Sequence, residues 1–263
     1  MQDFFRAIDM YSWLLLICIF VGLSGAALLG KFTWGQRVKR DAVAEEEVKI
    51  VLGATLSLFG LLIGFILSFA IGGYNTRVAA EENEAIAVGN AFQRTSLLKE
   101  SHQGQARQIL TDYLQLRTQF FETMDDTARA QIRLDSIRMQ TRMWGLISNI
   151  AKASPDPVIA TALNACNDLY TAQQKTMASW RHQIPAAAWA ILIVFGLCSN
   201  FLIGYNVRGK SGRDLMIYLV PAATALALFM IAEIDVPGKG IIHVEPSNLK
   251  AIGVTVANGG LLP

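Results

Sequence analysis

The sequence is short of charged residues, and the shortage is concentrated in four places. Asp, Glu, Lys and Arg make up 17% of its 263 residues, against about 25% in an average soluble domain. Four runs contain almost no charge: residues 11–30, 50–73, 185–205 and 215–234. Each is long enough for a helix to span the hydrocarbon core of a bilayer, which needs about 20 residues. We therefore predict a membrane protein with four transmembrane helices, in contact with the lipid bilayer.

Cysteine and histidine are also scarce, which argues against several kinds of site. The three cysteines, Cys18, Cys166 and Cys198, are odd in number and widely spaced, so they give neither a disulfide framework nor metal-ligand spacing. The three histidines stand alone, and there is no phosphate-binding glycine loop and no nucleophile elbow. The net charge of +2 leaves no basic footprint for nucleic acid. We predict no enzymatic activity, no catalytic residue, no metal and no cofactor.

The first apolar run raises one alternative. Ser24-Gly25-Ala26 would suit a signal-peptide cleavage site. The run is longer, however, than the apolar core of a signal peptide, which has about 7–15 residues. We favour a span that is retained.

The spans divide the chain into four parts. Residues 1–73 hold the first pair of spans, residues 185–236 hold the second pair, and residues 237–263 form a C-terminal tail. Residues 74–184 form an insert between the pairs. Its apolar positions recur at steps of three and four, which is typical of amphipathic helices; one such face holds Ala106, Leu110, Tyr113, Arg117 and Phe120. Turn signals divide the insert into about four helices, so the predicted fold class is all-α.

The second span has no clear end. No proline or loop-like cluster separates its apolar part from the charged residues that begin at Arg77. We therefore predict that this helix continues out of the membrane into a helical bundle. The last helix of the insert, which begins near Pro157, is predicted to lead into the third span at Pro185.

Basic residues gather in the short loops that join the spans of each pair. Eight lie there, against three on the opposite side. Positive charge in short loops marks the cytoplasmic side, so we predict that the bundle and both termini lie outside. The eight are Lys31, Arg37, Lys39, Arg40, Lys49, Arg208, Lys210 and Arg213, and the three are Arg6, Lys239 and Lys250.

The second span carries two residue stripes that suit different roles. The small stripe favours close packing between helices, and its alternative role is a pore lining with hydroxyl donors. The large apolar stripe would form a hydrophobic constriction in a ring of subunits. The two stripes cannot both face one pore. The small stripe is Gly53, Ser57, Gly60, Gly64 and Ser68, and the large stripe is Leu61, Phe65 and Phe69.

Charged residues follow the second span and end the fourth. Glu81 lies four residues from Arg77, a spacing typical of an ordinary ion pair on a helix surface, and we favour a solvated face. The alternative is an ion vestibule, since like charges at a pore mouth select ions. The vestibule candidates are Arg77, Glu81, Glu84, Glu233 and Asp235.

The order and spacing of several motifs resemble those of the bacterial bestrophin-like membrane proteins. The resemblance begins near Val48 and ends in the tail, where EIDVPGKGIIHVEPSNL matches the ending of that family. The sequence departs from the family at Ile86, where a polar residue is usual, at Tyr170, where a His is usual, and at Gly238-Lys239. The other motif residues are the run LLIGFILSF in the second span, then Glu84-Ala85, Gly89, Ala91-Phe92, Arg94, Tyr113, Arg117, Trp144, Ala162-Leu163-Asn164, Asp168, Arg181, Ile184-Pro185, Trp189 and Gly204-Tyr205.

The resemblance implies a multi-pass protein of the bacterial inner (plasma) membrane that is distantly similar to bestrophins, which are pentameric anion channels. It implies that the chain forms a homo-oligomer, a pentamer by analogy, and that small anions pass through it. It also makes Leu61, Phe65 and Phe69 the candidates for a pore neck. Bestrophins keep the helical domain and both termini in the cytosol, whereas the charge pattern here places them outside, and we follow the charge pattern.

Two functions remain open at this point. The first is an oligomeric, anion-conducting channel whose pore is lined by the second span. The second is a membrane-anchored sensor or scaffold whose helical bundle binds a ligand or partner. Oligomeric symmetry separates them, because a channel built from one span per subunit needs a ring, whereas a sensor is more often a dimer.

Overall fold

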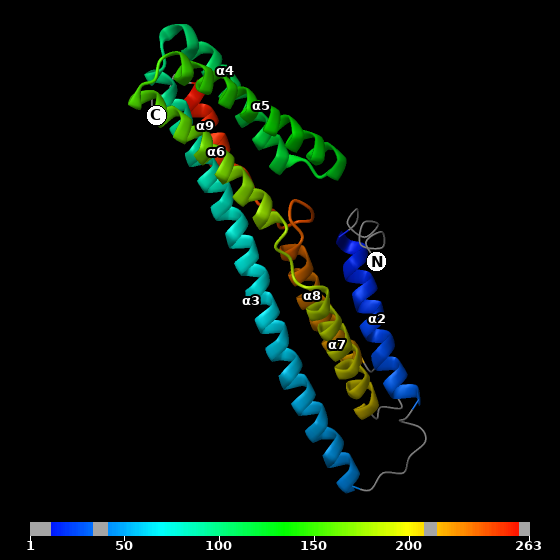
Figure 1. Ribbon diagram of the computed structural model, residues 1–263. Helices are drawn as coiled ribbons and strands as arrows, with labels where there is room; N and C mark the ends of the chain where they lie inside the picture. The colour runs from blue at the N-terminus through cyan, green and yellow to red at the C-terminus, as the bar shows by residue number, and fades with distance from the viewer. Residues whose placement is uncertain (1–11, 34–41, 208–214, 258–263) are drawn as a thin grey trace. The chain divides into compact units, whose positions relative to one another are not determined.

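The computed structural model describes residues 12–33, 42–207 and 215–257, and the regular elements in these ranges are all helices (Figure 1). Four of them are long and apolar enough to cross a membrane, with candidate spans at Trp13–Phe32, Glu46–Leu97, Ala186–Asn206 and Ile217–Asp235. The predicted all-α membrane fold is therefore confirmed. In chain order the elements are α2 (Ser12–Thr33), α3 (Ala42–Arg94), the 3-10 turn η1 (Thr95–Leu97), α4 (Glu100–Glu122), α5 (Asp126–Ala153), α6 (Pro157–Trp180), α7 (Ala186–Asn206), α8 (Met216–Asp235) and α9 (Ser247–Ala257).

The second span and the first helix of the insert are one helix, as predicted. α3 runs without a break from Ala42 to Arg94, over 53 residues. At 1.5 Å per residue its length is about 80 Å, far more than the roughly 30 Å of hydrocarbon that a span must cross. No glycine-proline pair or other breaker interrupts it, which explains why the backbone hydrogen bonding continues.

The described residues form two compact units. The first, here called the membrane unit, lies within Met1–Gly72 and Gln183–Ile242. The second, here called the bundle unit, lies within Gly73–His182 and His243–Pro263. α3 therefore contributes residues to both units, and the chain returns to the bundle unit after α8.

The membrane unit is held together by close contact between α2 and α7, which is possible because glycine lies at the contact. A Cβ added at Gly204 would collide with the backbone of Ala27, and one added at Gly30 would collide with the backbone of Phe201. Small residues of this kind let membrane helices approach closely. The small core of this unit is formed by the buried side chains of Leu23, Phe59, Leu192, Ala225 and Leu228.

The bundle unit packs α4, α5 and α6 side by side with the C-terminal part of α3 (Figure 1). The predicted face of α4 is confirmed, because all five of its residues are buried in the core. Asp125 and Asp156 accept hydrogen bonds from the first turns of α5 and α6, at 2.9 and 2.8 Å, and so cap both helices. Pro157 occupies the first turn of α6, where its missing N–H leaves no backbone bond unmade.

The connection between the bundle and the third span differs from the prediction. α6 ends at Trp180 and α7 begins at Ala186, so residues 181–185 break the helix that was expected to lead into the span. Pro185 explains the break, because proline has no N–H and disfavours helical geometry in the residue before it. The Ile184 N–H is satisfied instead by Asp235 Oδ1, at 2.9 Å.

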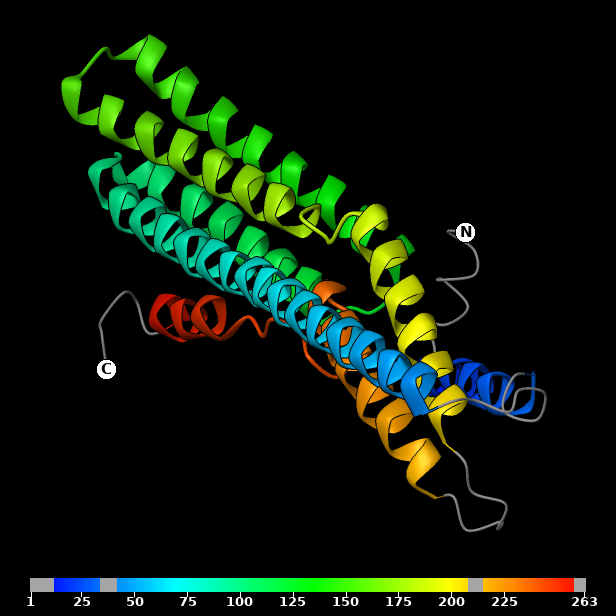
Figure 2. The same ribbon diagram turned by 90° about the horizontal axis from the view of Figure 1, so that it is seen from below.

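The C-terminal tail contains a helix that was not predicted. α9, red in Figure 2, packs against α4. Its Leu249 is fully buried in the bundle core. The sequence does carry a signal for it, since Leu249, Ile252 and Val256 recur at steps of three and four after Pro246. An isolated helix of 11 residues is marginal in water, so the packing against α4 is what stabilises it.

Candidate functional site

The membrane part of α3 buries one narrow face against the other helices of the membrane unit and leaves the rest of its surface exposed. Phe59 and Ala70 are buried on the inner face, at 3% and 2% exposure. Only 6% of the most apolar window of α3 is buried, against 22%, 22% and 50% for the other three candidate spans. The second span is thus the candidate span whose surface is least covered by its own chain.

The large apolar stripe lies on the outer surface of α3. Leu61, Phe65 and Phe69 are 55%, 63% and 48% exposed within the single chain. Their spacing of four residues aligns them along the helix axis. About half or more of each of these three side chains is therefore uncovered within the single chain.

The small stripe also lies on the outer surface of the membrane unit. A Cβ added at Gly53, Gly60 or Gly64 would have nothing within 4 Å, and Ser57 and Ser68 are exposed. The stripe is therefore not a packing seam within the chain, and the seam that the chain does contain is the one between α2 and α7. Gly64 and Phe65 follow each other in sequence, so the two stripes lie about 100° apart around the helix.

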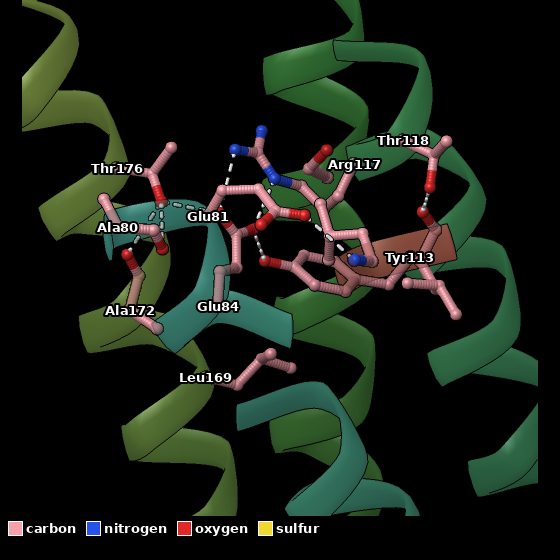
Figure 3. A network of polar contacts seen from close by, with 12 residues as sticks. Ala80, Glu81, Glu84, Tyr113, Arg117, Thr118, Leu169, Ala172 and Thr176 are labelled. Carbon is pink, nitrogen blue, oxygen red and sulfur yellow. Dashed lines mark hydrogen bonds and ion pairs between the residues drawn. The ribbon is translucent and has the colours of Figure 1, made fainter. Parts of the chain in front are cut away.

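A buried carboxylate joins the helices of the bundle unit (Figure 3). Glu84 on α3 forms an ion pair with Arg117 on α4, whose Nε and Nη2 donate to its two oxygens, the latter at 3.2 Å. The Tyr113 hydroxyl donates to Glu84 Oε1 at 2.8 Å, and the Thr176 hydroxyl of α6 donates to Oε2 at 2.7 Å. Gln140 of α5 donates from Nε2 to the Tyr113 hydroxyl at 3.3 Å, so the network includes all four helices.

The environment of this network favours the charged form of Arg117. Burial lowers the pKa of Arg117, but the Glu84 carboxylate and Tyr113 raise it, and the net shift is upward. The pKa of Tyr113 is raised well above its ordinary value, mainly by burial and then by the nearby Glu84 charge. The Arg117 guanidinium also lies 4.2 Å from the centre of the Phe120 ring, which favours the cation. The network is thus a buried ion pair with its hydrogen-bond partners, and it links the helices of the bundle.

Glu81 has a different structural role, one turn earlier on α3. Its carboxylate accepts the Leu249 N–H at 2.9 Å and the Asn248 side-chain amide at 2.7 Å. Both donors lie in the first turn of α9, where four backbone N–H groups lack partners within the helix and the helix dipole favours negative charge. Glu81 therefore caps α9 from another helix.

The two acidic candidates at the end of α8 hold backbone N–H groups of the membrane unit. Glu233 Oε2 accepts the Ile241 N–H at 2.6 Å, and Asp235 holds Ile184 as described above. The turn that brings Ile241 back includes Gly240 at φ +81°, a conformation that favours glycine, and a Cβ there would also collide with the Glu233 carboxylate. Both carboxylates are buried.

The favoured interpretation of the charged group after the second span, a solvated face, is wrong. Arg77, Glu81 and Glu84 are 2%, 1% and 0% exposed. Arg77 Nη1 donates to the His182 carbonyl oxygen at 3.4 Å instead of lying in water. The helix spacing was predictable from the sequence, but the covering of this part of α3 by other helices was not. Glu82, on the other side of the helix, is exposed as expected.

Sequence reasoning did not single out the partners of Glu84 as a site. The available signal was Arg117, an arginine on an otherwise apolar helix face, because a buried cation requires an acidic partner. The distance along the chain between Glu84 and Thr176 leaves no local pattern that would join them. Among the described residues, no group of three His, Cys, Asp or Glu side chains could hold a metal ion.

Comparisons with known proteins agree with this architecture. A model of the bestrophin-like domain family matches residues 17–249. A crystal structure of a bacterial bestrophin homologue from Klebsiella pneumoniae, carrying one tryptophan-to-alanine substitution, is similar with a TM-score of 0.61 at 14% identity, over 97% of this chain and 96% of that chain. Another crystal structure, described as a membrane protein with a proline-to-alanine substitution, has a TM-score of 0.62 at 12% identity, over 95% of this chain and 99% of that chain. At such identities the likeness shows a shared fold. A search of curated proteins found no match.

Proposed function

Because the chain belongs to the bestrophin-like family, we propose that it assembles in the bacterial inner membrane as a homo-oligomeric, anion-conducting channel with span two lining the pore. Family and fold support a channel-type membrane protein. The observation that carries the proposal is the exposure of span two. Only 6% of its most apolar part is buried, and two aligned stripes on it are exposed within the single chain. Neighbouring subunits in a ring would cover the surface of this helix that a single chain leaves exposed.

The two stripes are assigned different roles in this ring. Leu61, Phe65 and Phe69 form the neck, because a ring of large apolar side chains can gate by expelling water. The small stripe, which includes Gly60 and Gly64, packs against the neighbouring subunit, because glycine allows close approach. The assignment of a pentamer, and of small anions as the permeant ions, rests on the family resemblance.

The vestibule role of the five charged candidates stays a prediction, and the contacts within the chain favour structural roles. Glu84 is neutralised by Arg117, and Glu81 caps α9. A vestibule built from them would require α4, α6 or α9 to move away. The orientation with the bundle and both termini outside is also part of the proposal, supported by the basic residues of the short loops.

The test is halide flux from liposomes that contain the purified protein. We expect flux above that of empty liposomes, and we expect the double variant Phe65→Ala, Phe69→Ala to change its rate. Ile193→Ala is the matched control, since Ile193 is an exposed apolar residue of α7 outside span two. Flux that is equal in wild type and double variant would contradict the neck assignment.

A second function is favoured by one observation, the unbroken helix α3. Because a single helix contains both the apolar window and part of the bundle core, a ligand that reorganises the bundle could act on the span directly. The function would then be a membrane-anchored sensor or scaffold. The absence of flux from folded, oriented protein would contradict the channel and support this alternative.

A further inference from the structure

The bundle unit contains a cavity of about 270 Å³ whose lining is rich in arginine. It lies where the end of α4, the first turns of α5 and the last turns of α6 meet. Arg129, Arg133 and Arg181 contribute three positive charges to the lining, and Asp126 contributes one negative charge, which leaves a formal excess of two. A cavity with this charge favours an anionic ligand.

The one acidic group of the lining is already neutralised. Arg129 Nη1 forms an ion pair with Asp126 Oδ1 at 2.9 Å. Arg129 is 8% exposed, donates to the backbone carbonyls of Phe120 and Thr123, and has its guanidinium 5.0 Å from the centre of the Trp180 ring. This arginine is held in place as part of the wall, and it screens an entering anion from the Asp126 carboxylate.

The other two arginines are available to a ligand. Arg133 and Arg181 are exposed, and neither guanidinium makes a hydrogen bond or ion pair with another residue of the described chain. They come from different helical segments, one from the second turn of α5 and one from the residue that follows α6. Two unpaired guanidinium groups at one cavity repel each other, and a bound anion would offset this repulsion.

Trp180 forms an aromatic part of the cavity wall. It lines the cavity, and its Nε1–H is buried with no hydrogen-bond partner within the described ranges. Its ring is fixed by Phe120 and Phe121, with ring centres 4.7 and 5.6 Å away. Trp180 is therefore a fixed part of the cavity wall.

We propose that this cavity binds a phosphate group, held by Arg133 and Arg181. The planar fork of arginine matches the oxygens of phosphate better than a point charge does. The volume accommodates a phosphate with a small attached group. Two sources share this chemistry, a soluble phosphate compound and a phospholipid headgroup. The second is relevant because Arg181 lies in the short segment, residues 181–185, that precedes the membrane span α7.

The soluble source is tested by isothermal titration calorimetry of the full-length protein in detergent, with pyrophosphate as the probe. We expect saturable binding that is at least about tenfold weaker in the variant Arg133→Gln, Arg181→Gln, because each charged hydrogen bond contributes about a factor of ten or more. Arg142→Gln is the matched control, an exposed arginine on α5 outside the cavity. It should bind pyrophosphate as wild type does.

The lipid source is tested by native mass spectrometry of protein extracted from phosphatidylglycerol vesicles. Retained phosphatidylglycerol in wild type and in Arg142→Gln, but not in the double variant, would identify the headgroup as the ligand. Because Arg133 and Arg181 are exposed, the double variant should unfold at the wild-type temperature, which thermal unfolding checks. Binding of neither probe, or equal binding by wild type and double variant, would overturn the proposal. The binding measurements do not depend on conduction, so they test the cavity independently of the proposed channel.

Discussion

Glu84 and Arg117 form an ion pair in which neither side chain has any exposed surface. Removing two charges from water is costly, and this cost is offset only when the remaining hydrogen-bonding positions are filled. Tyr113 and Thr176 fill those of the carboxylate. The pair and its hydrogen bonds therefore link α3, α4 and α6 within the bundle unit.

Removing either partner of this pair should destabilise the bundle strongly. Glu84→Ala or Arg117→Ala leaves an unpaired buried charge, for which the expected loss is roughly 3–5 kcal/mol of unfolding free energy. Thermal unfolding in detergent measures it. Arg138→Ala is the control, because Arg138 pairs with Asp135 on the surface and exposed pairs contribute about 0–1 kcal/mol. Equal effects of the buried and exposed variants would refute the structural role of Glu84.

Loss of the Glu81 carboxylate should loosen α9. Glu81→Ala removes the acceptor of the Leu249 and Asn248 donors, and loss of a helix cap typically reduces stability by about 0.5–2 kcal/mol. Hydrogen exchange of residues 247–257 should become faster in this variant. Glu82→Ala, which changes an exposed neighbour, should leave the exchange unchanged. Unaltered protection of α9 in Glu81→Ala would show that Leu249 alone anchors it.

Adding a single methyl group should impair folding at one glycine of the membrane spans and leave folding unchanged at another. Gly204→Ala places a Cβ against the backbone of Ala27, which cannot yield as a flexible side chain would. We expect little folded protein, measured as the monodisperse fraction on size exclusion after extraction. Gly60→Ala meets nothing within 4 Å and should fold normally.

Larger residues at the small stripe should act on assembly instead of on folding. Gly60→Leu with Gly64→Leu would separate subunits that pack through this stripe. Native mass spectrometry should show a smaller assembly of folded protein. An unchanged assembly would remove the stripe from the subunit interface.

Cys166 should be inert to alkylation in the folded protein. Burial raises the pKa of its thiol from 9.0 to about 11, and only the thiolate reacts. A shift of this size reduces the thiolate fraction near pH 8 by about a hundredfold. Maleimide labelling of a variant with Cys18→Ala and Cys198→Ala, before and after unfolding, measures the difference.

The same shift gives stability a pH dependence. Below pH 9.0 the Cys166 thiol is neutral in both the folded and the unfolded chain, so its contribution is constant. Between 9.0 and about 11 the thiol ionises only when unfolded, so stability should fall as the pH rises. Cys166→Ala should show a smaller decline over this range, and an identical decline would contradict the shifted pKa.

The predicted orientation can be tested with one introduced cysteine. Gln119 is exposed on α4, so Gln119→Cys in a variant without native cysteines should react with an impermeant thiol reagent in intact cells. Protection until the cells are lysed would place the bundle in the cytosol and reverse the orientation. Western detection of the labelled protein separates protection from poor expression.

The sequence by itself determined those features that depend on local composition and periodicity. Long uncharged runs can be accommodated only by lipid or a large core, so the membrane helices were predictable. The absence of a breaker after Gly73 made α3 continuous, and steps of three and four identified the buried face of α4.

Only the tertiary structure decided which polar groups meet. Glu81 and Leu249, or Glu84 and Thr176, are far apart in the chain, and their pairing depends on how helices pack. The sequence therefore suggested a solvated surface at a part of α3 that the fold buries. The helix α9 was not predicted, because its stability comes from packing against a helix distant in the chain. The same holds for the arginine-rich cavity, because Arg133 and Arg181 share a wall only once α5 and α6 lie together. Local pattern sets the elements, whereas desolvation and charge pairing between elements set the sites.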